Sequence, residues 1–459
     1  CTIIVPASFK VMAYIIALNP NLLTGFTANG GQELWNAVFL ATCIASAFGT
    51  ILMAFIANKP FAMSAGMGLN SFFAVVVANI ATIAGVSYLE GFRAGLCIIL
   101  IEGIVFIILS ALNVREKIVQ AIPLGVRLGI SPAIGLMLLN IGFGSNAGVY
   151  SETGGPFYAM ANFFGSLTAS YAKDTMGSGY PVMVLTVITM FVGLFTIVVL
   201  DHKKVKGSVL YGILTGSVIY WAGEYFVLHI NPFASLATAS WLPPFKDMAA
   251  LTLFKFDFNV LKSLGMFTVV TLVLTFCIID MFDTIGTLVG TASRANMLDE
   301  NGNMPNMKEA LLSDACGTVC GALTGTSTIT TFVESASGVE AGGRTGLTSL
   351  VTGLIFLACM FISPIAAIIP AAATSSALIY VGILMLQGLK NIDFDDISVC
   401  VPVFIMLVAM PISGSIGHGI GLGLIAYTII KFISGKAKEV SPLTLVLSIL
   451  FLVKFFFAF

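Results

Sequence analysis

The sequence predicts an all-α polytopic membrane protein with 14 transmembrane segments. Its 459 residues are 58% hydrophobic and only 9% charged, whereas soluble globular domains carry about 25% charged residues. Apolar runs of about 18 or more residues, long enough to cross a bilayer as a helix, recur along the whole chain. The formal net charge of -1 gives no sign of a nucleic-acid-binding surface.

The apolar runs define the expected spans in chain order, with boundaries accurate to a few residues. They are 8–24, 35–57, 61–83, 94–112, 120–143, 181–200, 206–226, 266–290, 307–323, 329–338, 345–369, 374–389, 398–413 and 416–433. A further apolar stretch, 442–458, is expected to lie as a helix at the inner membrane surface. A fifteenth span is the alternative.

Basic residues predict the orientation of the spans. Lys and Arg are concentrated in the short loops 113–117, 201–206 and 434–439. Positively charged loops stay on the cytoplasmic side of the membrane. We therefore expect a multi-pass protein of the cell membrane whose N-terminus and three basic loops are cytoplasmic.

The two halves of the chain resemble each other. Segment 48–62 (FGTILMAFIANKPFA) parallels 316–330 (CGTVCGALTGTSTIT), and segment 122–139 parallels 369–386, with Gly135 over Gly382. Shorter matches pair 92–96 with 343–347 and 181–190 with 402–410. Each half holds seven spans, so the second copy inserts upside down. Inverted repeats of this kind are typical of transporters, with the substrate site near the midplane at broken helices.

Two segments at corresponding places in the repeats interrupt the helical pattern. They read FAMSAGMGLNSFF (61–73) and TSTITTFVESASG (326–338). The β-branched and hydroxyl residues of the second favour a strand, and irregular backbone at membrane depth survives only inside the protein or along a cavity. We expect the two segments to pair as short antiparallel strands, each followed by a half-helix whose N-terminus points at a ligand. Close helix packing is the alternative role for Gly66 and Gly68.

Carboxylates inside the apolar segments mark the candidate site. Asp280 and Asp283 share one helix face with Thr284 and Thr287, and Glu334 lies in the second interruption. Each acid at a helix centre costs roughly 2.5–3.5 kcal/mol on insertion scales. Such acids either share a proton or meet a cation or a ligand rich in donors. A structural ion pair of Asp280 or Asp283 with Lys59 or Arg344 is the alternative.

Glu102 and Asp314 also fall within spans. The sequence around them contains no polar cluster. We therefore expect these two acids to make packing or gating hydrogen bonds rather than to bind substrate.

The ligand expected at this site is a planar heterocycle rich in N–H groups. The three acids and Asn70 offer hydrogen-bond acceptors, and aromatic rings could stack on a flat ligand: Phe61, Phe72, Phe73 and Phe332. A protonatable carboxylate at the site links proton binding to substrate binding. No metal or cofactor is expected, because the chain has only three His residues and no metal-ligand motif.

Four motifs of the chain resemble those of one family. They are NKPFAMSAGMGLNSFF (58–73), DMFDTIGTLVG (280–290), TTFVESASGVEAGGRTGLTS (330–349) and GKAKEVSP (435–442). The chain resembles the AzgA-like branch of the nucleobase–cation symporters, which are bacterial and fungal permeases for hypoxanthine, guanine and adenine. The similarity extends from about Tyr14 to Lys454.

The resemblance implies a uracil-permease-like fold in which two domains move against each other like an elevator. The core domain would comprise residues 1–112 and 266–369, and the gate domain residues 113–230 and 370–434. Residues 231–265 would form an extracellular connection, and residues 435–459 an apolar helix at the membrane surface. Members of the family are often dimeric, so a homodimer is a further expectation.

The resemblance also implies the site residues. Asn70, Asp280, Asp283 and Glu334 match positions that contact the purine or couple its transport to protons. Gly68 and the segment Phe332, Val333, Glu334 and Ser335 are expected to line the same site. Proton coupling is expected at Asp283, Glu334 and Asp280. Which of Asp280 and Asp283 contacts the purine stays open.

Other functions remain as alternatives. An anion transporter of the same fold, for sulfate or bicarbonate, predicts basic residues at the helix breaks, where this sequence has acids. A membrane enzyme would need further ligands or bases near Asp280 and Asp283, and a channel would show flux that does not saturate.

Overall fold

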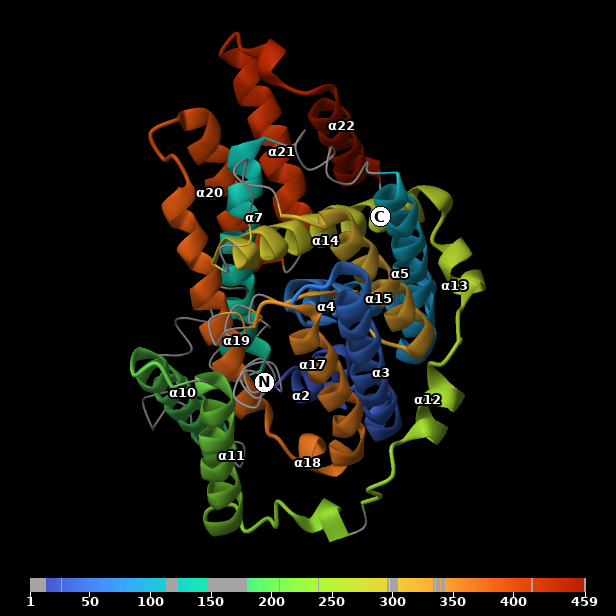
Figure 1. Cartoon of the computed structure of the whole chain (residues 1–459), viewed down its shortest axis with the longest axis vertical. Helices are drawn as coiled ribbons and strands as arrows, with labels where there is room; N and C mark the ends of the chain where they lie inside the picture. Colours follow the sequence, from blue (N-terminus) through green and yellow to red (C-terminus); the bar gives the residue numbers. More distant parts are fainter. Residues whose placement is uncertain are drawn as a thin grey trace.

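Helices make up most of the computed structural model, with a single two-stranded sheet between them in the described part (Figure 1). The structure describes residues 14–25, 27–112, 123–146, 180–205, 207–237, 239–294, 297, 304–332, 335, 339, 343–413 and 416–457. Among these residues, six helices are long and apolar enough to cross a membrane, and several shorter apolar helices accompany them. The predicted polytopic α-helical membrane fold is therefore confirmed.

The longer helices overlap the apolar segments that the sequence predicts, but several extend beyond them, as α5 does by beginning at Tyr88 and not at residue 94. The longer ones are α2 (Ile15–Thr24), α3 (Gly31–Leu52), α4 (Met67–Ala84), α5 (Tyr88–Ala111), α7 (Leu124–Ile141), α10 (Tyr180–His202), α11 (Ser208–Phe226), α14 (Met266–Arg294), α15 (Met307–Thr324), α17 (Gly346–Cys359), α19 (Ala371–Met385), α20 (Ile397–Ser413), α21 (Ile416–Ile433) and α22 (Pro442–Phe457). Short helices α12 (Phe245–Leu251) and α13 (Phe258–Ser263) lie in the connection before α14, and α18 (Ser363–Ala367) follows α17.

Local signals explain where helices begin and end. Helix α5 starts at a capping box in which the Ser87 side chain accepts from the Glu90 N–H and the Glu90 carboxylate accepts from the Ser87 N–H. Helix α3 ends in a π-helical turn, Met53–Ala57, followed by Asn58 in the left-handed conformation (φ 50°). Helix α15 ends at Gly325 (φ 112°), a conformation that suits glycine. After the ends of α3 and α15 the chain leaves the helical conformation, and a short strand follows each helix.

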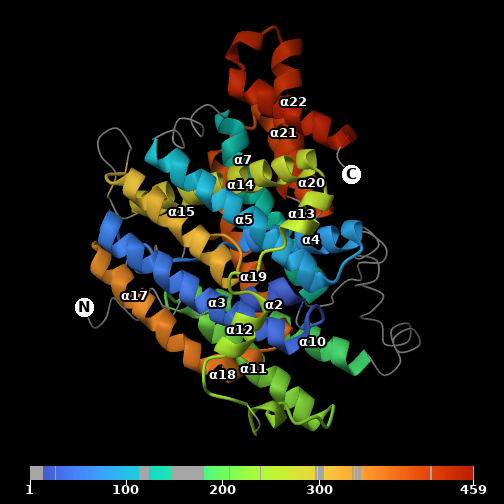
Figure 2. The ribbon, with the colours of Figure 1, turned by 90° about the vertical axis from the view of Figure 1, so that its right-hand side faces the viewer.

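The helices pack as two groups (Figures 1 and 2). The first group contains α2, α3, α4, α5, α14, α15 and α17. The second contains α7, α10, α11, α19, α20 and α21. Helix α14 also reaches α7 and α21, so it connects the first group to the second.

Pairs of glycines meet where helices from the two halves of the sequence cross. A Cβ built on Gly135 would lie 2.7 Å from the Gly382 carbonyl oxygen, and one built on Gly382 would lie 2.7 Å from the Gly135 carbonyl oxygen. Gly49 and Gly317 meet in the same reciprocal way, since a Cβ built on either one would lie 3.4 Å from the Cα of the other. At Gly135 and Gly382 a side chain would collide with the opposite backbone, so glycine allows this close approach, as small residues do in membrane proteins.

The predicted pairing of the two interrupted segments is confirmed. Strand β1 (Met63–Ala65) and strand β2 (Ile329–Thr331) are antiparallel, with Ser64 opposite Thr330 at the centre. All residues of both strands are buried. The strands satisfy each other's backbone groups at a depth where water is excluded.

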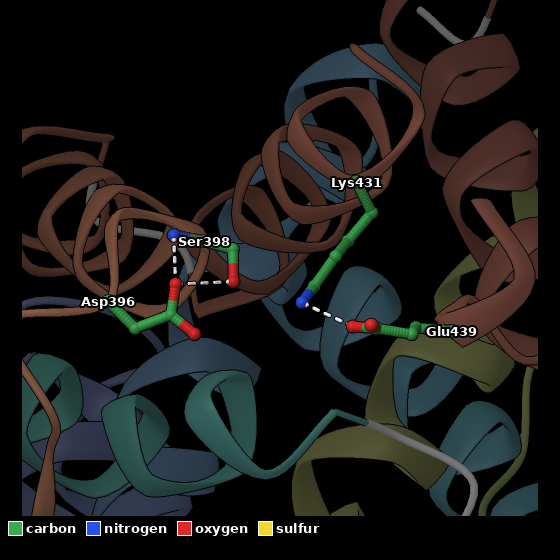
Figure 3. Close-up of polar contacts among 4 residues, drawn as sticks. All are labelled: Asp396, Ser398, Lys431 and Glu439. Atoms are coloured by element: carbon green, nitrogen blue, oxygen red, sulfur yellow. Dashed lines mark hydrogen bonds and ion pairs between the residues drawn. The ribbon is translucent and has the colours of Figure 1, made fainter. Parts of the chain in front are cut away.

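Helix α22 packs antiparallel along α21. The Thr428 and Ser448 hydroxyls are 2.8 Å apart, and Gly421 faces the Phe451 ring further along the helix pair. At the end of α21, the Lys431 ammonium donates to the Glu439 carboxylate at 2.7 Å (Figure 3). The expected position of this helix at the inner membrane surface stays a prediction.

Candidate functional site

Hydroxyl side chains of the flanking helices hold the strand pair in place. The Thr50 hydroxyl of α3 accepts from the Met63 N–H at 2.9 Å and donates to the Met63 carbonyl at 3.0 Å. The Thr318 hydroxyl of α15 donates to the Ile329 carbonyl at 3.1 Å. These bonds satisfy strand groups on the sides that the partner strand does not reach. The strand pair is therefore a buried, hydrogen-bonded floor, and the candidate site residues lie around it.

Helix α4 begins directly after strand β1 at this floor. Its first turn contains Gly68 and Asn70, both buried, as the sequence predicts for a half-helix. The Asn70 amide oxygen accepts from the Ser327 hydroxyl. Its amide nitrogen has no hydrogen-bond partner among the described residues. Asn70 therefore offers a donor next to the positive end of the α4 dipole.

Asp283 of α14 lies beside the start of α4. A Cβ built on Gly66, the residue that precedes α4, would be 3.4 Å from the Asp283 Oδ2 atom. Asp283 is partly exposed, whereas Asp280, one turn earlier, is completely buried. A carboxylate near a helix N-terminus is stabilised by the partial positive charge there.

Asp280 belongs to a buried polar cluster around Thr284. The Thr284 hydroxyl lies 3.1 Å from Asp280 Oδ1, 3.1 Å and 3.2 Å from the two Asp314 oxygens, and 2.7 Å from the Thr330 hydroxyl. Asp314 makes a hydrogen bond, as the sequence predicts, but it does so within a polar cluster that the sequence analysis did not find. Its partners come from α14, 30 residues earlier, and from β2, so the sequence around Asp314 does not reveal them.

Glu102 of α5 approaches the same strand from another side. The Thr328 hydroxyl, just before β2, donates to the Glu102 Oε2 atom at 3.0 Å. Glu102 is completely buried. It makes the kind of structural hydrogen bond that the sequence predicts for it.

The segment after β2 is tied to the residue before β1. The Phe332 N–H donates to the Ala62 carbonyl at 3.1 Å, and the Ser335 hydroxyl accepts from the Ala62 N–H at 3.0 Å. Phe332 and Ser335 therefore lie beside the strand pair, and their expected contact with a ligand stays a prediction. Val333 and Glu334 lie outside the described residues, so their expected contacts with a ligand stay predictions.

The other aromatic candidates pack into the protein. Phe61 and Phe73 are completely buried. The Phe73 ring packs edge-on against Phe92, with centroids 5.4 Å apart, and the Phe72 ring lies 4.7 Å from Phe276. These contacts give Phe72 and Phe73 packing roles, whereas Phe332 directly follows β2 in the chain.

Arg344, one of the two cations considered as ion-pair partners for the acids, follows this segment. Its guanidinium donates to the backbone carbonyls of Val339 and Gly343. It therefore stabilises the turn that leads into α17.

Comparisons with known proteins agree with this arrangement. A family model described as "Permease family" (Xan_ur_permease) matches residues 7–416. The chain is 36% identical over 453 residues to the guanine/hypoxanthine permease PbuO of Bacillus subtilis, covering 98% of this chain and 95% of the relative. It is 34% identical over 452 residues to the adenine permease AdeP of Escherichia coli, covering 98% and 91%.

A solved structure shows the same fold. The transmembrane domain of the cyanobacterial bicarbonate transporter BicA matches with a TM-score of 0.61, covering 90% of this chain and 96% of that domain. The two sequences are only 16% identical, so this match establishes the fold alone. The family match, the purine-permease relatives and the fold confirm the resemblance found in the motifs. The chain is a multi-pass membrane transporter that belongs to the Xan_ur_permease family.

Proposed function

We propose that the chain is a proton-coupled purine nucleobase symporter for hypoxanthine, guanine or adenine, with an elevator-type alternating-access mechanism. The relatives named as adenine and guanine/hypoxanthine permeases support the substrate class, because they match this chain over nearly its whole length. The single observation that carries the proposal is the strand floor where Asn70 and Asp283 meet the start of α4.

The chemistry of the floor suits a purine. A purine ring presents both N–H donors and ring-nitrogen acceptors along its edges. The Asn70 amide nitrogen has no partner among the described residues and can donate, and the Asp283 carboxylate beside Gly66 can accept. We propose that Asp283, which is partly exposed, contacts the purine, and that the buried Asp280 serves coupling.

The packing of the helices supports 14 segments in a 7+7 inverted repeat. When the two halves of the sequence are aligned, Gly49 matches Gly317 and Gly135 matches Gly382. Each glycine touches its own counterpart, which is the relation expected of residues on a two-fold axis. An axis of this kind in the membrane plane is the geometry of inverted-repeat transporters.

The two helix groups suit an elevator motion. The group that contains α3, α4, α14 and α15 carries all the described site residues, and we propose that it is the moving core domain. The group of α7, α10, α11, α19, α20 and α21 would be the gate domain. Because α14 contacts α7 and α21, movement of the core must change this interface.

An anion transporter of the same fold is the alternative. A buried anion would need positive groups around it, because an unpaired charge in a water-free site is costly. The described floor instead brings Asp280, Asp283 and Asp314 together. These acids favour a neutral ligand with N–H groups over bicarbonate or sulfate.

Uptake of radiolabelled hypoxanthine by a purine-transport-deficient strain tests the proposal. We expect uptake that saturates, that unlabelled adenine or guanine competes for, and that a proton uncoupler reduces. Asp283→Asn should reduce it, while Asp395→Asn, which changes an exposed acid before α20, should not. Uptake that neither the uncoupler nor the Asp283→Asn substitution changes would refute the proposal.

A further inference from the structure

Helix α22 follows α21 back along its length, in the opposite direction (Figures 1 and 2). Nearer the turn that joins the two helices, the Thr428 and Ser448 hydroxyls lie 2.8 Å apart. At the other end of the pair, the His418 ring packs edge-on against the Phe455 ring, with centroids 5.6 Å apart. Since His418 lies in the first turn of α21 and Phe455 in the last turn of α22, the two helices are in contact over nearly their whole lengths.

The two helices are long enough to reach through most of a bilayer. Helix α21 has 18 residues and α22 has 16, which at about 1.5 Å per residue gives lengths of about 27 Å and 24 Å. The hydrocarbon core of a membrane is about 30 Å thick, and local thinning of the bilayer accommodates somewhat shorter helices. Because α22 returns to the beginning of α21, it covers nearly the same depth as α21.

The polar side chains of α22 face the protein. Thr444 and Ser448 are 0% and 4% exposed. The Ser448 hydroxyl donates to the Leu424 carbonyl of α21 at 3.1 Å, and hydroxyl bonds between helices of this kind are common inside membranes. These polar groups are therefore satisfied within the protein and need no water.

The outer side of α22 is apolar. A helix that lies on the membrane surface turns a charged or polar face toward water. The sequence of α22 has one charged residue, Lys454, close to its end. Four large apolar side chains of this helix are between 44% and 76% exposed: Val446, Ile449, Leu452 and Phe456. Polar groups inside and apolar groups outside are the arrangement expected of a helix surrounded by lipid.

The turn between the two helices carries the charges. Lys436 and Lys438 are exposed there. The Lys431 ammonium pairs with Glu439 and also lies 5.6 Å from the centre of the Tyr427 ring (Figure 3). Lys and Arg keep short loops on the cytoplasmic side of the membrane. The chain therefore enters α22 from a basic turn expected at the inner surface.

The far end of the helix pair contacts α14. A Cβ built on Gly417, at the start of α21, would lie 2.5 Å from the Thr275 Cγ2 atom of α14. Helix α22 contacts α14 as well. The pair is therefore held at both ends, by the ion pair at the turn and by α14 at the other end.

We propose that α22 crosses the membrane as a fifteenth segment, antiparallel to α21, with lipid chains covering its exposed apolar face. Its C-terminal end then lies on the side opposite to the basic turn. The sequence leaves two positions open for residues 442–458, and the packing along α21 favours the span over the helix at the inner surface. This segment is an addition to the two seven-helix repeats, and its position does not depend on which substrate is carried.

Quenching of tryptophan fluorescence by lipids brominated at defined acyl carbons measures the depth of α22. The full chain, reconstituted in such lipids, would carry Ile449→Trp or Phe456→Trp, both on the exposed face, and the signal is the difference from the wild type. Leu422→Trp, exposed near the middle of α21, is the matched control. We expect Ile449→Trp to be quenched by the same deep bromines as Leu422→Trp. Phe456→Trp should lie shallower by up to about 10 Å, because seven residues separate it from Ile449.

The depths decide between the two positions of α22. Equal, shallow depths for Ile449→Trp and Phe456→Trp are the result for a helix parallel to the membrane surface and would overturn the proposal. A shallow Leu422→Trp would overturn it too, since α22 cannot cross beside a helix that does not cross. Neither readout requires transport, so a failure of the proposed purine transport leaves this test intact.

Reporter fusions to the full chain determine on which side α22 ends. In a bacterial host, alkaline phosphatase is active only outside the cytoplasm, where its disulfides form, and green fluorescent protein exported in the unfolded state stays dark. Joined after Phe459, the phosphatase should be active and the fluorescent protein dark. The same reporters joined before Cys1, where the chain is expected to be cytoplasmic, are the control and should show the reverse. Phosphatase activity after Phe459 no higher than in this control would overturn the proposal.

Discussion

At the residue scale, Asn70 offers a specific donor to the ligand. Its amide nitrogen is completely buried and has no partner among the described residues, although its oxygen is held by Ser327. A buried donor left without a partner costs about 1–3 kcal/mol. A ligand that accepts from it removes that cost.

Asn70→Ala should therefore weaken purine binding. We expect the Kd for hypoxanthine to rise roughly 5- to 150-fold, which corresponds to about 1–3 kcal/mol. Isothermal titration calorimetry on the purified protein measures this change. Asn36→Ala, which removes an amide that instead bonds to Asp247, is the matched control. An unchanged Kd in Asn70→Ala would remove Asn70 from the site.

Asp283 and Asp280 should respond differently to neutralisation. Because Asp283 is partly exposed beside the α4 N-terminus, Asp283→Asn should raise the KM for purine by about tenfold or more, through loss of a charged hydrogen bond worth about 1.5–3 kcal/mol. Asp280→Asn should mainly lower proton-driven accumulation. Initial rates of uptake at several substrate concentrations separate the two. If Asp280→Asn raises the KM and Asp283→Asn does not, the two roles are reversed.

At the element scale, the strand pair depends on the absence of a side chain at Gly66. A methyl group there would lie 2.6 Å from the Thr330 Cγ2 atom, closer than real contacts allow. Gly66 has φ -67°, so the cost of Gly66→Ala is a collision and not backbone strain.

Gly66→Ala should lower both stability and transport. Overpacking of a tight interior costs roughly 1–3 kcal/mol, and the displaced β2 would disturb Thr330 and the acids around Thr284. Thermal unfolding and hypoxanthine uptake measure the two effects. Gly216→Ala, another close contact but between α11 and α19, should affect stability more than substrate affinity. Equal purine affinity in Gly66→Ala and the wild type would contradict the role of the floor.

The contact between α21 and the segment before α22 should depend on pH. The hydrogen bond from Lys431 lowers the pKa of Glu439, and hydrogen bonds from Ser398 lower the pKa of the neighbouring Asp396 (Figure 3). An acid with a lowered pKa stabilises the fold above its ordinary value, here 4.5 for Glu439, and that stabilisation is lost as the pH falls below it.

Glu439→Gln tests this contact. We expect a small loss of thermal stability at neutral pH, because Glu439 is 53% exposed and water screens the pair. The difference from the wild type should disappear as the pH is lowered below 4.5. Glu309→Gln serves as a control from another part of the chain. A difference that grows on acidification would contradict the assigned contact.

The strands and helix segments could be predicted from the sequence because their signals are local. The run of Thr and Ser residues before Phe332 favours a strand, and the glycines around Met67 interrupt a helix. The register, with Ser64 opposite Thr330, could not be predicted, because it depends on Thr50 and Thr318 on the flanking helices. Asp314 was missed for the same reason.

At the scale of the whole molecule, the sequence suggests the proposed repeat because glycines occupy matching positions in the two halves. Gly135 and Gly382, which are aligned between the two halves of the sequence, also contact each other in the structure. The division of the helices into two groups has no comparable local signal. The bounds of a core and a gate domain come from the family resemblance and stay a prediction.

The orientation predicted from the basic loops can be tested with single cysteines. We expect Lys203→Cys and Lys438→Cys to react with an impermeant maleimide only after cells are permeabilised, because both exposed residues lie in basic loops. Ser240→Cys, exposed in the connection before α14, should react in intact cells. Labelling of Ser240→Cys only after permeabilisation would reverse the predicted topology.

The central claim is that the acids around the strand floor bind a purine and not an anion. Thermal stabilisation of the purified protein by hypoxanthine, adenine, guanine, uracil, bicarbonate and sulfate tests it most directly. A ligand at about 100 times its Kd should stabilise the native state by about 2.7 kcal/mol. We predict saturable stabilisation by at least one purine and none by the anions. Stabilisation by bicarbonate or sulfate, with no response to any purine, would contradict the account.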